Sequence, residues 1–324
     1  MSERTRVAVV GVGDFGRNHV RVYAGLENAE LVGVYDTDRG KAEAVAKEFG
    51  TAALESLDAV AERAQAATVA VPTVEHARVG VALLERGLDV LVEKPMARTL
   101  AEADDLVSAA ALGGRILQIG HVERFNPAVV AAAGIVERPL FFEVHRLGVF
   151  TARSLDVDVV YDVMIHDLEI LLALAGPVTE VKAVGIPVVT DKVDIAHARL
   201  EFETGAVANV TASRISTERV RKLRFFQRHE YVSIDYARRD ALRIRVSQPG
   251  PEPRFEFDKL PVEAEEPLRG ELRAFLESVR TRRTPTVDGV AGRNALELAD
   301  RVMASIREHA RTVRLHSETP QAAL

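Results

Sequence analysis

The segment from residue 6 to residue 36, RVAVVGVGDFGRNHVRVYAGLENAELVGVYD, constrains the fold more than any other part of the chain. It begins with an apolar run at residues 7–10. Three glycines with the spacing G-x-G-x-x-G follow this run: Gly11, Gly13 and Gly16. After an amphipathic stretch, a second apolar run at residues 31–35 ends at Asp36. This order predicts a strand, a tight turn, a helix and a second strand.

The glycine spacing is typical of a dinucleotide-binding turn. The first glycine permits a tight turn, the second lets the backbone approach a pyrophosphate, and the third lets the helix pack closely on the strand. Asp36 stands where a carboxylate accepts hydrogen bonds from the hydroxyls of the adenosine ribose and repels a 2′-phosphate. We therefore expect NAD, rather than NADP, as the cofactor. The alternative, for the glycines alone, is an ordinary turn before a helix.

Composition excludes several classes of function. The chain has 324 residues, no cysteine and a net charge of -6 without a long basic run. We therefore expect two domains, no thiolate metal site and no nucleic-acid partner. No H-E-x-x-H motif or other ligand cluster is present, so no metal is expected. The first strand begins almost at the N-terminus and no apolar run is long enough to span a bilayer, which predicts a cytoplasmic protein without a membrane partner.

Helical and strand-like patterns alternate in residues 1–120. Helices are expected at residues 39–49, 57–64, 75–86 and 100–112, and further strands at residues 67–71, 88–92 and 115–119. This alternation predicts a Rossmann domain with a doubly wound parallel sheet. Such a sheet binds its ligand at the carboxyl ends of its strands, so the loops after the strands are the expected site.

The pattern changes in residues 121–324. Strands are expected at residues 140–147, 181–189, 195–203, 206–213, 222–227, 231–235 and 242–246, and helices at residues 127–133, 159–175, 267–282 and 289–311. Strand-like runs joined by short turns indicate an α+β domain built on a mostly antiparallel, open sheet. Because this sheet is rich in Val, Ile, Leu and Phe, we expect it to be covered by another copy of the chain, in a homodimer or homotetramer.

Several polar residues follow expected strands at the cofactor edge of the first domain. Glu93 and Lys94 come directly after the strand at residues 88–92, in the sequence E-K-P. An acid and an ammonium group at that edge are placed to contact the ribose beside the nicotinamide and a reacting hydroxyl, respectively. Pro72 and His76 follow the preceding strand in the same way. The alternatives are an ordinary loop start and, for His76, a satisfied histidine in the first turn of a helix.

Asp162 and His166 form a second candidate group. A separation of four residues puts both on one face of a helix, where the carboxylate can orient the imidazole and stabilise its charge. Histidine has an ordinary pKa of about 6.5, which suits general-base catalysis near neutral pH. The alternative is a buried hydrogen bond between the two side chains that only joins the helix to the sheet.

Together these motifs resemble a known family. They are the glycine fingerprint with Asp36, P-x-x-x-H at residues 72–76, E-K-P at residues 93–95 and D-x-x-x-H at residues 162–166. Their order and spacing agree with the glucose–fructose oxidoreductase / inositol dehydrogenase / MocA (Gfo/Idh/MocA) family, over nearly the whole chain. The resemblance implies a Rossmann domain at residues 1–120 and, at residues 121–324, a substrate-binding domain whose open sheet is often used for oligomerisation.

The resemblance also implies roles for single residues. Lys94 matches the family's active-site lysine, which commonly precedes a cis proline peptide, and Glu93 matches a ribose contact. Asp162 and His166 match a substrate-facing pair with His166 as the proton acceptor, and Arg124 matches a substrate contact. The implied cofactor-binding residues are Gly11, Gly13, Asp14, Phe15, Gly16, Asp36, Pro72, His76, Glu93 and Lys94.

Two positions depart from the family pattern. Many relatives have Thr where this chain has Val71, which weakens a minor cofactor contact. Many carry glycines where this chain has Val-Val-Tyr at residues 159–161, which leaves the shape of the substrate loop open. Within the family, the segments GHVERFNPAV and VVYDVMIHDLEILL most resemble those of members that oxidise C3 of a UDP-N-acetylhexosamine in amino-sugar synthesis for lipid A.

The motifs and the resemblance thus predict an NAD-dependent oxidoreductase acting on a secondary hydroxyl of a sugar, with a nucleotide sugar as the expected substrate. The alternatives are an inositol or free-sugar dehydrogenase of the same family, and a sensor that binds the dinucleotide without turnover. A nucleotide sugar also needs cations for its diphosphate, for which Arg124, Arg146, Arg153 and Arg214 are candidates.

Overall fold

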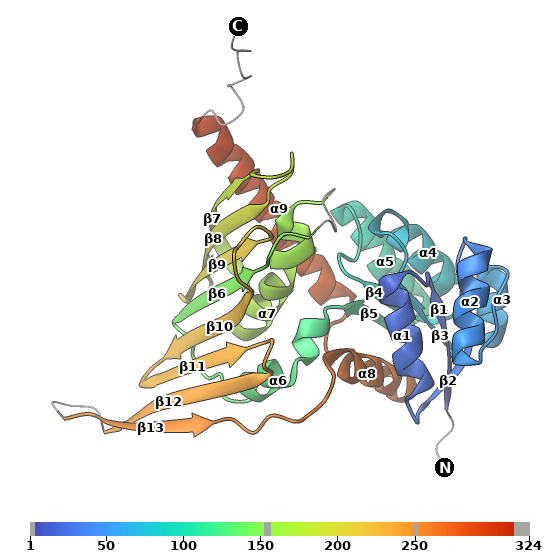
Figure 1. Ribbon diagram of the computed structural model, residues 1–324, viewed down its shortest axis with the longest axis horizontal. Helices are drawn as coiled ribbons and strands as arrows, with labels where there is room; N and C mark the ends of the chain where they lie inside the picture. The colour runs from blue at the N-terminus through green and yellow to red at the C-terminus, as the bar shows by residue number, and fades with distance from the viewer. Residues whose placement is uncertain (1–3, 152–156, 249–251, 314–324) are drawn as a thin grey trace, which may run out of the picture. The chain divides into compact units, whose positions relative to one another are not determined.

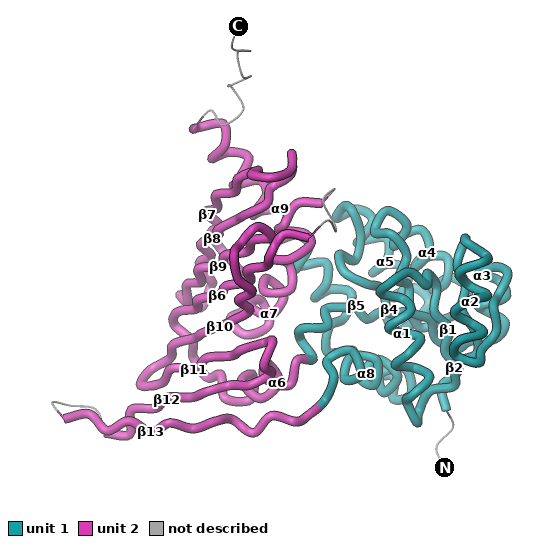
Figure 2. The backbone as a smooth tube through the Cα atoms, viewed as in Figure 1, with its two compact units in different colours: residues 1–125, 265–296 teal, residues 126–264, 297–324 magenta. Residues whose placement is uncertain are grey.

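The computed structural model describes residues 4–151, 157–248 and 252–313. The chain divides into two compact units, coloured separately in Figure 2. Unit 1 comprises Met1–Phe125 and Glu265–Leu296, and unit 2 comprises Asn126–Ala264 and Glu297–Leu324. The sequence pattern predicts a single boundary at residue 120. The structure differs because the chain returns to unit 1 after residue 264, and a linear pattern of helices and strands does not reveal such a return.

Unit 1 is built on a five-stranded parallel sheet with the strand order β2-β1-β3-β4-β5 (Figure 1). Its strands are β1 (Thr5–Val10), β2 (Ala29–Tyr35), β3 (Ala66–Val69), β4 (Asp89–Glu93) and β5 (Leu117–Gly120). The strand order reverses at β1, which has β2 on one side and β3 on the other. Such a reversal creates a ligand-binding crevice at the carboxyl ends of the strands. The predicted doubly wound sheet is confirmed.

Three of the described helices of unit 1 begin at residues whose side chains cap them. The helices of unit 1 are α1 (Asp14–Ala24), α2 (Arg39–Phe49), α3 (Leu57–Arg63), α4 (Thr73–Glu85), α5 (Leu100–Gly113), the 3-10 helix η1 (Val122–Phe125) and α8 (Pro267–Thr281). Asp38, Ser56 and Thr99 each accept a hydrogen bond from a first-turn N–H of α2, α3 and α5. Helix α2 ends at Gly50, whose φ of 65° suits a helix terminus.

Helices cover both faces of this sheet. The core on one face includes side chains of β1, β4, α1 and α8: Val7, Val9, Leu91, Val20, Tyr23, Leu272, Phe275 and Leu276. Val92, next to Leu91, lies against Gly80 of α4, which also contacts Leu106 of α5. Because successive side chains of a strand alternate between the two faces, α1 and α8 lie on one face and α4 and α5 on the other.

Unit 2 is built on an eight-stranded sheet with the order β13-β12-β11-β10-β6-β9-β8-β7. Its strands are β6 (Phe141–Leu147), β7 (Val178–Ile186), β8 (Ile195–Phe202), β9 (Val207–Ser213), β10 (Val220–Gln227), β11 (Glu230–Asp235), β12 (Asp240–Gln248) and β13 (Arg254–Lys259). Strands β6 and β9 pair in parallel and the other neighbours pair antiparallel. The predicted α+β architecture on a mostly antiparallel sheet is confirmed.

The helices of unit 2 include the segment that carries the D-x-x-x-H motif. They are α6 (Pro127–Ala133), the π-helix η2 (Val160–Met164), α7 (Ile165–Ala175) and the later part of α9 (Gly289–Thr312), which begins in unit 1. Taking all described helices together, none is both long and apolar enough to cross a bilayer.

The sequence pattern does not predict strand β13. Its apolar residues, Phe255 and Phe257, are 55% and 67% exposed. The strand lies at the edge of the sheet, where it pairs with β12 alone among the described strands. An edge strand with exposed side chains lacks the buried alternation by which strands are recognised.

Most apolar side chains of the unit 2 sheet point to one face. On β6, Phe142 and Val144 are fully buried, whereas Glu143 and His145 are partly exposed on the opposite, outward face. The outward face also carries one apolar row across six strands, here named the outward row: Val207, Phe141, Phe226, Tyr231, Ile244 and Phe257. The outward face is therefore less apolar than the composition of the strands suggests, and this row is the part of it that needs a cover.

Candidate functional site

The glycine turn between β1 and α1 leaves an open cradle at the carboxyl end of the parallel sheet. Gly11 has a φ of +86°, and a Cβ atom there would lie 2.6 Å from the carbonyl oxygen of Ala70. A Cβ atom on Gly16 would lie 1.8 Å from the carbonyl oxygen of Gly11, so α1 packs directly on the turn. At Gly13, no atom counted among the described residues lies within 4 Å of the Cβ position. The space at Gly13 suits a bulky anionic group such as a pyrophosphate.

The start of α1 adds hydrogen-bond donors to this cradle. Within the described chain, no side chain caps the first turn of α1. The first N–H groups of a helix lack intrahelical acceptors and carry a partial positive charge, so they bind phosphate oxygens well.

A cavity of about 730 Å³ opens at the turn. Its lining includes six of the predicted cofactor-binding residues: Gly11, Gly13, Asp14, Phe15, Asp36 and Pro72. Lys41 and Arg78 also line it, and each lies beside a carboxylate. Lys41 is 3.6 Å from Asp38, and Arg78 is 2.5 Å from Glu75. A 2′-phosphate in this cavity would therefore meet the carboxylates of Asp38 and Glu75 as well as these two cations.

Asp36 is fixed at the end of β2 by two backbone groups. Its Oδ2 atom accepts a hydrogen bond from the N–H of Val12 at 2.8 Å, and its Oδ1 atom accepts one from the N–H of Asp38 at 2.9 Å. A carboxylate has further lone pairs, which can accept hydrogen bonds from ribose hydroxyls. The cradle, the helix terminus and the held carboxylate together fit NAD.

Glu93, at the end of β4, is held by a histidine that the sequence motifs do not single out. Its Oε1 atom lies 2.9 Å from Nε2 of His19 on α1. Gly120, its neighbour across β4 and β5, makes room for it, because a Cβ atom there would lie 2.9 Å from Oε1. Burial opposes the charge of Glu93, but the contact with His19 and the charge of Lys94 outweigh it and lower the pKa of Glu93. The sequence feature that could have identified His19 is its position as a polar residue on the buried face of α1.

Lys94 lies next to a second histidine that the motifs miss. Its peptide bond to Pro95 is cis, as the family resemblance implies. His121, the residue after β5, is 1% exposed. Burial and the charge of Lys94 lower the pKa of His121 to about 3. The imidazole of His121 therefore stays neutral near Lys94 and adds no second positive charge there.

His76 lies beneath the loops rather than in the lining of the cavity. It is 1% exposed, its Nδ1 atom is 2.8 Å from the carbonyl oxygen of Pro95, and its Nε2 atom is 2.9 Å from that of Val71. Burial lowers the pKa of His76, while the two carbonyl oxygens oppose this shift. The ring thus links the loop after β3 to the loop after β4, which supports a role in positioning both.

In unit 2, Asp162 and His166 lie in neighbouring helical segments. Asp162 belongs to the π-helix η2, and His166 lies in the first turn of α7. Both side chains are half-buried, whereas those of Met164, Ile165 and Asp167 are buried. Both side chains are thus partly open to solvent, and their position on one face stays a prediction of the spacing. A π-helical turn is rare and frequent at functional sites, and the spacing does not reveal it.

Two family profiles match this chain. "Oxidoreductase family, NAD-binding Rossmann fold" matches residues 5–121, and "GFO/IDH/MocA C-terminal domain" matches residues 130–229. The chain belongs to the Gfo/Idh/MocA family. It is an NAD-binding oxidoreductase, as its motifs predict.

Relatives with known names match both units. A UDP-N-acetylglucosamine 3-dehydrogenase of Acidithiobacillus ferrooxidans is 36% identical over 93% of this chain and 97% of its own length. The solved structure of UDP-N-acetylglucosamine 3-dehydrogenase GnnA from Acidithiobacillus ferrooxidans has a TM-score of 0.89 at 33% identity, and the match covers 95% of this chain and 99% of that one. The scyllo-inositol 2-dehydrogenase (NAD(+)) of Bacillus subtilis is 30% identical over 67% of this chain and 69% of its own length.

In this member of the Gfo/Idh/MocA family, the residue after His166 anchors the helix. Arg146 of β6 donates to both carboxylate oxygens of Asp167, at 2.6 Å from Nε and 2.8 Å from Nη2, and both residues are buried. The hydroxyl of Tyr236 donates to the same carboxylate at 3.1 Å, and the guanidinium of Arg146 lies 4.6 Å from the centre of the Tyr236 ring. A buried, bidentate ion pair of this kind fixes α7 to the sheet beside His166.

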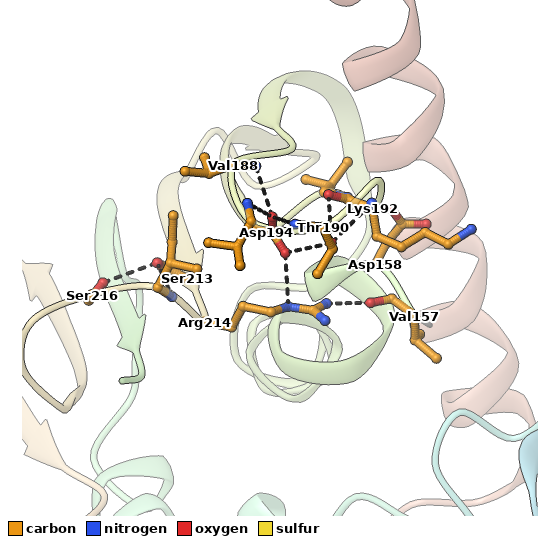
Figure 3. A network of polar contacts seen from close by, with 12 residues as sticks. Val157, Asp158, Val188, Thr190, Lys192, Asp194, Ser213, Arg214 and Ser216 are labelled. Carbon is orange, nitrogen blue, oxygen red and sulfur yellow. Dashed lines mark hydrogen bonds and ion pairs between the residues drawn. The ribbon is translucent and has the colours of Figure 1, made fainter. Parts of the chain in front are cut away.

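The four arginines predicted to bind a diphosphate differ in their surroundings. Arg146 is held by Asp167, as described. Arg214 is 8% exposed and lies with its Nε atom 3.8 Å from Asp194 (Figure 3). Arg153 lies outside the described residues. Arg124, in η1, is half-buried. Arg146 and Arg214 therefore stabilise the protein itself, and among the described candidates Arg124 keeps the expected role as a prediction.

Proposed function

We propose that this protein oxidises the C3 hydroxyl of UDP-N-acetylglucosamine with NAD, as a step of amino-sugar synthesis for lipid A. The observation that carries the proposal is the similarity to UDP-N-acetylglucosamine 3-dehydrogenases, which spans both units at more than 30% identity. The sequences GHVERFNPAV and VVYDVMIHDLEILL support the same substrate.

The proposed chemistry uses the side chains that the E-K-P and D-x-x-x-H motifs supply. His166 takes the proton of the reacting hydroxyl, and the carboxylate of Asp162 supports the positive charge that His166 then carries. The ammonium group of Lys94 stabilises the negative charge that develops on the oxygen. When bound, NAD supplies the acceptor for the hydride that leaves the same carbon. Loss of the proton and the hydride converts the secondary alcohol into a ketone.

The proposed cofactor contacts follow the geometry of unit 1. The backbone at Gly11, Gly13, Asp14, Phe15 and Gly16 binds the pyrophosphate, and its N–H groups supply the donors. Asp36 binds the adenosine ribose, and Glu93, with Lys94, binds the ribose beside the nicotinamide. Pro72 and His76 shape the loop between them. Residues 1–120 thus supply the proposed cofactor contacts and residues 121–324 the proposed substrate contacts, with Arg124 among the latter, although residues 265–296 pack with unit 1.

The proposal includes a homodimer or homotetramer that forms through the outward face of the unit 2 sheet. The outward row supports it, because a second copy would remove Phe226 and Phe257, 36% and 67% exposed, from water. Light scattering at micromolar concentration tests this expectation, and a monomer would contradict it. We also propose a cytoplasmic location, where NAD and nucleotide sugars are available together.

A substrate panel tests the proposed function. The purified protein is mixed with NAD and UDP-N-acetylglucosamine, UDP-N-acetylgalactosamine, glucose, myo-inositol or scyllo-inositol, and the absorbance of NADH is followed. We expect the highest kcat/KM with UDP-N-acetylglucosamine. A higher kcat/KM with an inositol would instead favour an inositol dehydrogenase. The similarity to the scyllo-inositol 2-dehydrogenase supports this second candidate function. NADH binding without turnover of any sugar would favour the sensor.

A further inference from the structure

Asp194 is the centre of a buried network in unit 2 (Figure 3). The residue is fully buried just before β8. Its Oδ2 atom accepts hydrogen bonds from the N–H groups of Val188, Val189 and Thr190 at 2.8, 2.7 and 2.9 Å. Its Oδ1 atom accepts one from the Thr190 hydroxyl at 2.8 Å. Burial opposes its charge, but these donors outweigh burial and lower the pKa of Asp194 to about 2, so the carboxylate stays ionised.

Arg214, just after β9, connects this carboxylate to another segment. Its Nε atom lies 3.8 Å from Oδ1 of Asp194, and its backbone N–H donates to the carbonyl oxygen of Asp194 at 3.0 Å. Its Nη2 group points the other way and donates to the carbonyl oxygen of Val157 (Figure 3). The planar guanidinium offers donors in several fixed directions, which a lysine ammonium on a flexible stem does not.

Two more hydrogen bonds join the same segments. The carboxylate of Asp158 accepts a hydrogen bond from the N–H of Val193 at 2.8 Å. The N–H of Val159 donates to the carbonyl oxygen of Val193 at 2.9 Å. Residues 157–159 are therefore tied to the loop before β8 and to Arg214 at three consecutive positions.

Residues 157–159 lead directly into the helical segment with the D-x-x-x-H motif. The π-helix η2 begins at Val160 and contains Asp162, and α7 follows with His166. A π-helical turn has i→i+5 hydrogen bonds, so its side chains are rotated relative to those of a regular α-helix. Their direction therefore depends on the contacts that hold the two ends of the turn. Arg146 and Asp167 hold the later end, and the Asp194 network holds the earlier one.

We propose that Arg214, anchored by Asp194, is a positioning residue that fixes the start of the π-helical turn and thereby the direction of Asp162 and His166. The proposal rests on the proposed function in one respect: the kinetic test assays oxidation of UDP-N-acetylglucosamine. We assign Arg214 contacts with Asp194 and Val157, and none with substrate or cofactor.

The test compares Arg214→Met with Arg301→Met. Arg301, on α9, is the control because it also donates to backbone carbonyl oxygens, those of Val178 at 2.7 Å and Thr179 at 3.0 Å, which lie at the start of β7 and not in residues 157–166. We expect Arg214→Met to lower kcat about tenfold or more, with NADH affinity within about twofold of the wild type. Arg301→Met should keep the wild-type kcat. Arg214→Lys, which keeps the charge but not the fork, should fall between Arg214→Met and the wild type.

Hydrogen–deuterium exchange gives a second readout that needs no substrate. Backbone amides of residues 157–166 should exchange faster in Arg214→Met and Asp194→Asn than in the wild type, and at the wild-type rate in Arg301→Met. If Arg214→Met does not fold, Arg214→Lys carries the same two measurements. Wild-type exchange in residues 157–166, or wild-type kcat in folded Arg214→Met, would overturn the proposal. Failure of the wild type to oxidise UDP-N-acetylglucosamine would instead count against the proposed function and leave the exchange result decisive.

Discussion

Breaking the buried pair of Arg146 and Asp167 should destabilise the protein much more than breaking an exposed pair on α8. Their side chains are 5% and 0% exposed. Removal of one partner leaves a buried charge without compensation, which costs about 3–5 kcal/mol. Arg280 and Glu277 of α8 form the control, since they lie 2.5 Å apart with side chains 54% and 52% exposed. An exposed pair of this kind contributes about 0–1 kcal/mol.

We therefore expect Arg146→Met to lower the free energy of unfolding by about 3–5 kcal/mol. Arg280→Met should lower it only slightly. Urea unfolding followed by far-ultraviolet circular dichroism measures both. The double variant Arg146→Met/Asp167→Leu removes both charges and should recover most of the loss, because apolar side chains of similar size tolerate burial. Equal losses in Arg146→Met and Arg280→Met, or no recovery in the double variant, would refute this explanation.

Three further predictions concern the cofactor, the catalytic groups and pH. Asp36→Ser should erode the preference of kcat/KM for NAD over NADP, and equal efficiency with both cofactors in the wild type would contradict the role of Asp36. Lys94→Ala and His166→Ala should each lower kcat about a hundredfold or more, while NADH titration shows binding largely kept; wild-type kcat in His166→Ala would exclude it as the base. The folded-state pKa of His121, about 3, lies below its ordinary 6.5, so stability is complete above pH 6.5 and falls as the unfolded chain takes up a proton below it. His121→Asn should flatten the fall of the urea midpoint between about pH 6.5 and pH 4, and parallel curves for the two proteins would show that another group is responsible.

Much of the fold follows from local sequence signals. Helix α2 has the predicted range, Arg39–Phe49, because Asp38 caps its start and Gly50 ends it. Strands such as β4, buried on both faces, show continuous apolar runs that identify them. The return of α8 to unit 1 and the edge strand β13 were not predictable in this way. Both depend on which segments meet in space, and a periodic pattern does not contain that information.

The sequence predicted the site residues best where a local motif identifies them. The glycine turn and Asp36 are local features, and the structure gives them the geometry that the spacing indicates. The supporting residues were missed because their partners are distant in the sequence. His19 lies 74 residues from Glu93, and Arg146 lies 21 residues from Asp167. Arg146 was a predicted diphosphate contact, but in the structure it forms a buried ion pair with Asp167.

The return of residues 265–296 to unit 1 determines when the cofactor unit can fold during synthesis. Helix α8 contributes three buried side chains to the same core as Val7 and Tyr23: Leu272, Phe275 and Leu276. When the first 125 residues leave the ribosome, this face of their sheet still lacks α8, one of its covering helices, and it stays partly open until strands β6 to β13 of unit 2 have also emerged. A fragment that stops at residue 125 should therefore aggregate rather than bind NAD. A fragment in which residues 265–296 are joined back to it is the smallest one expected to fold.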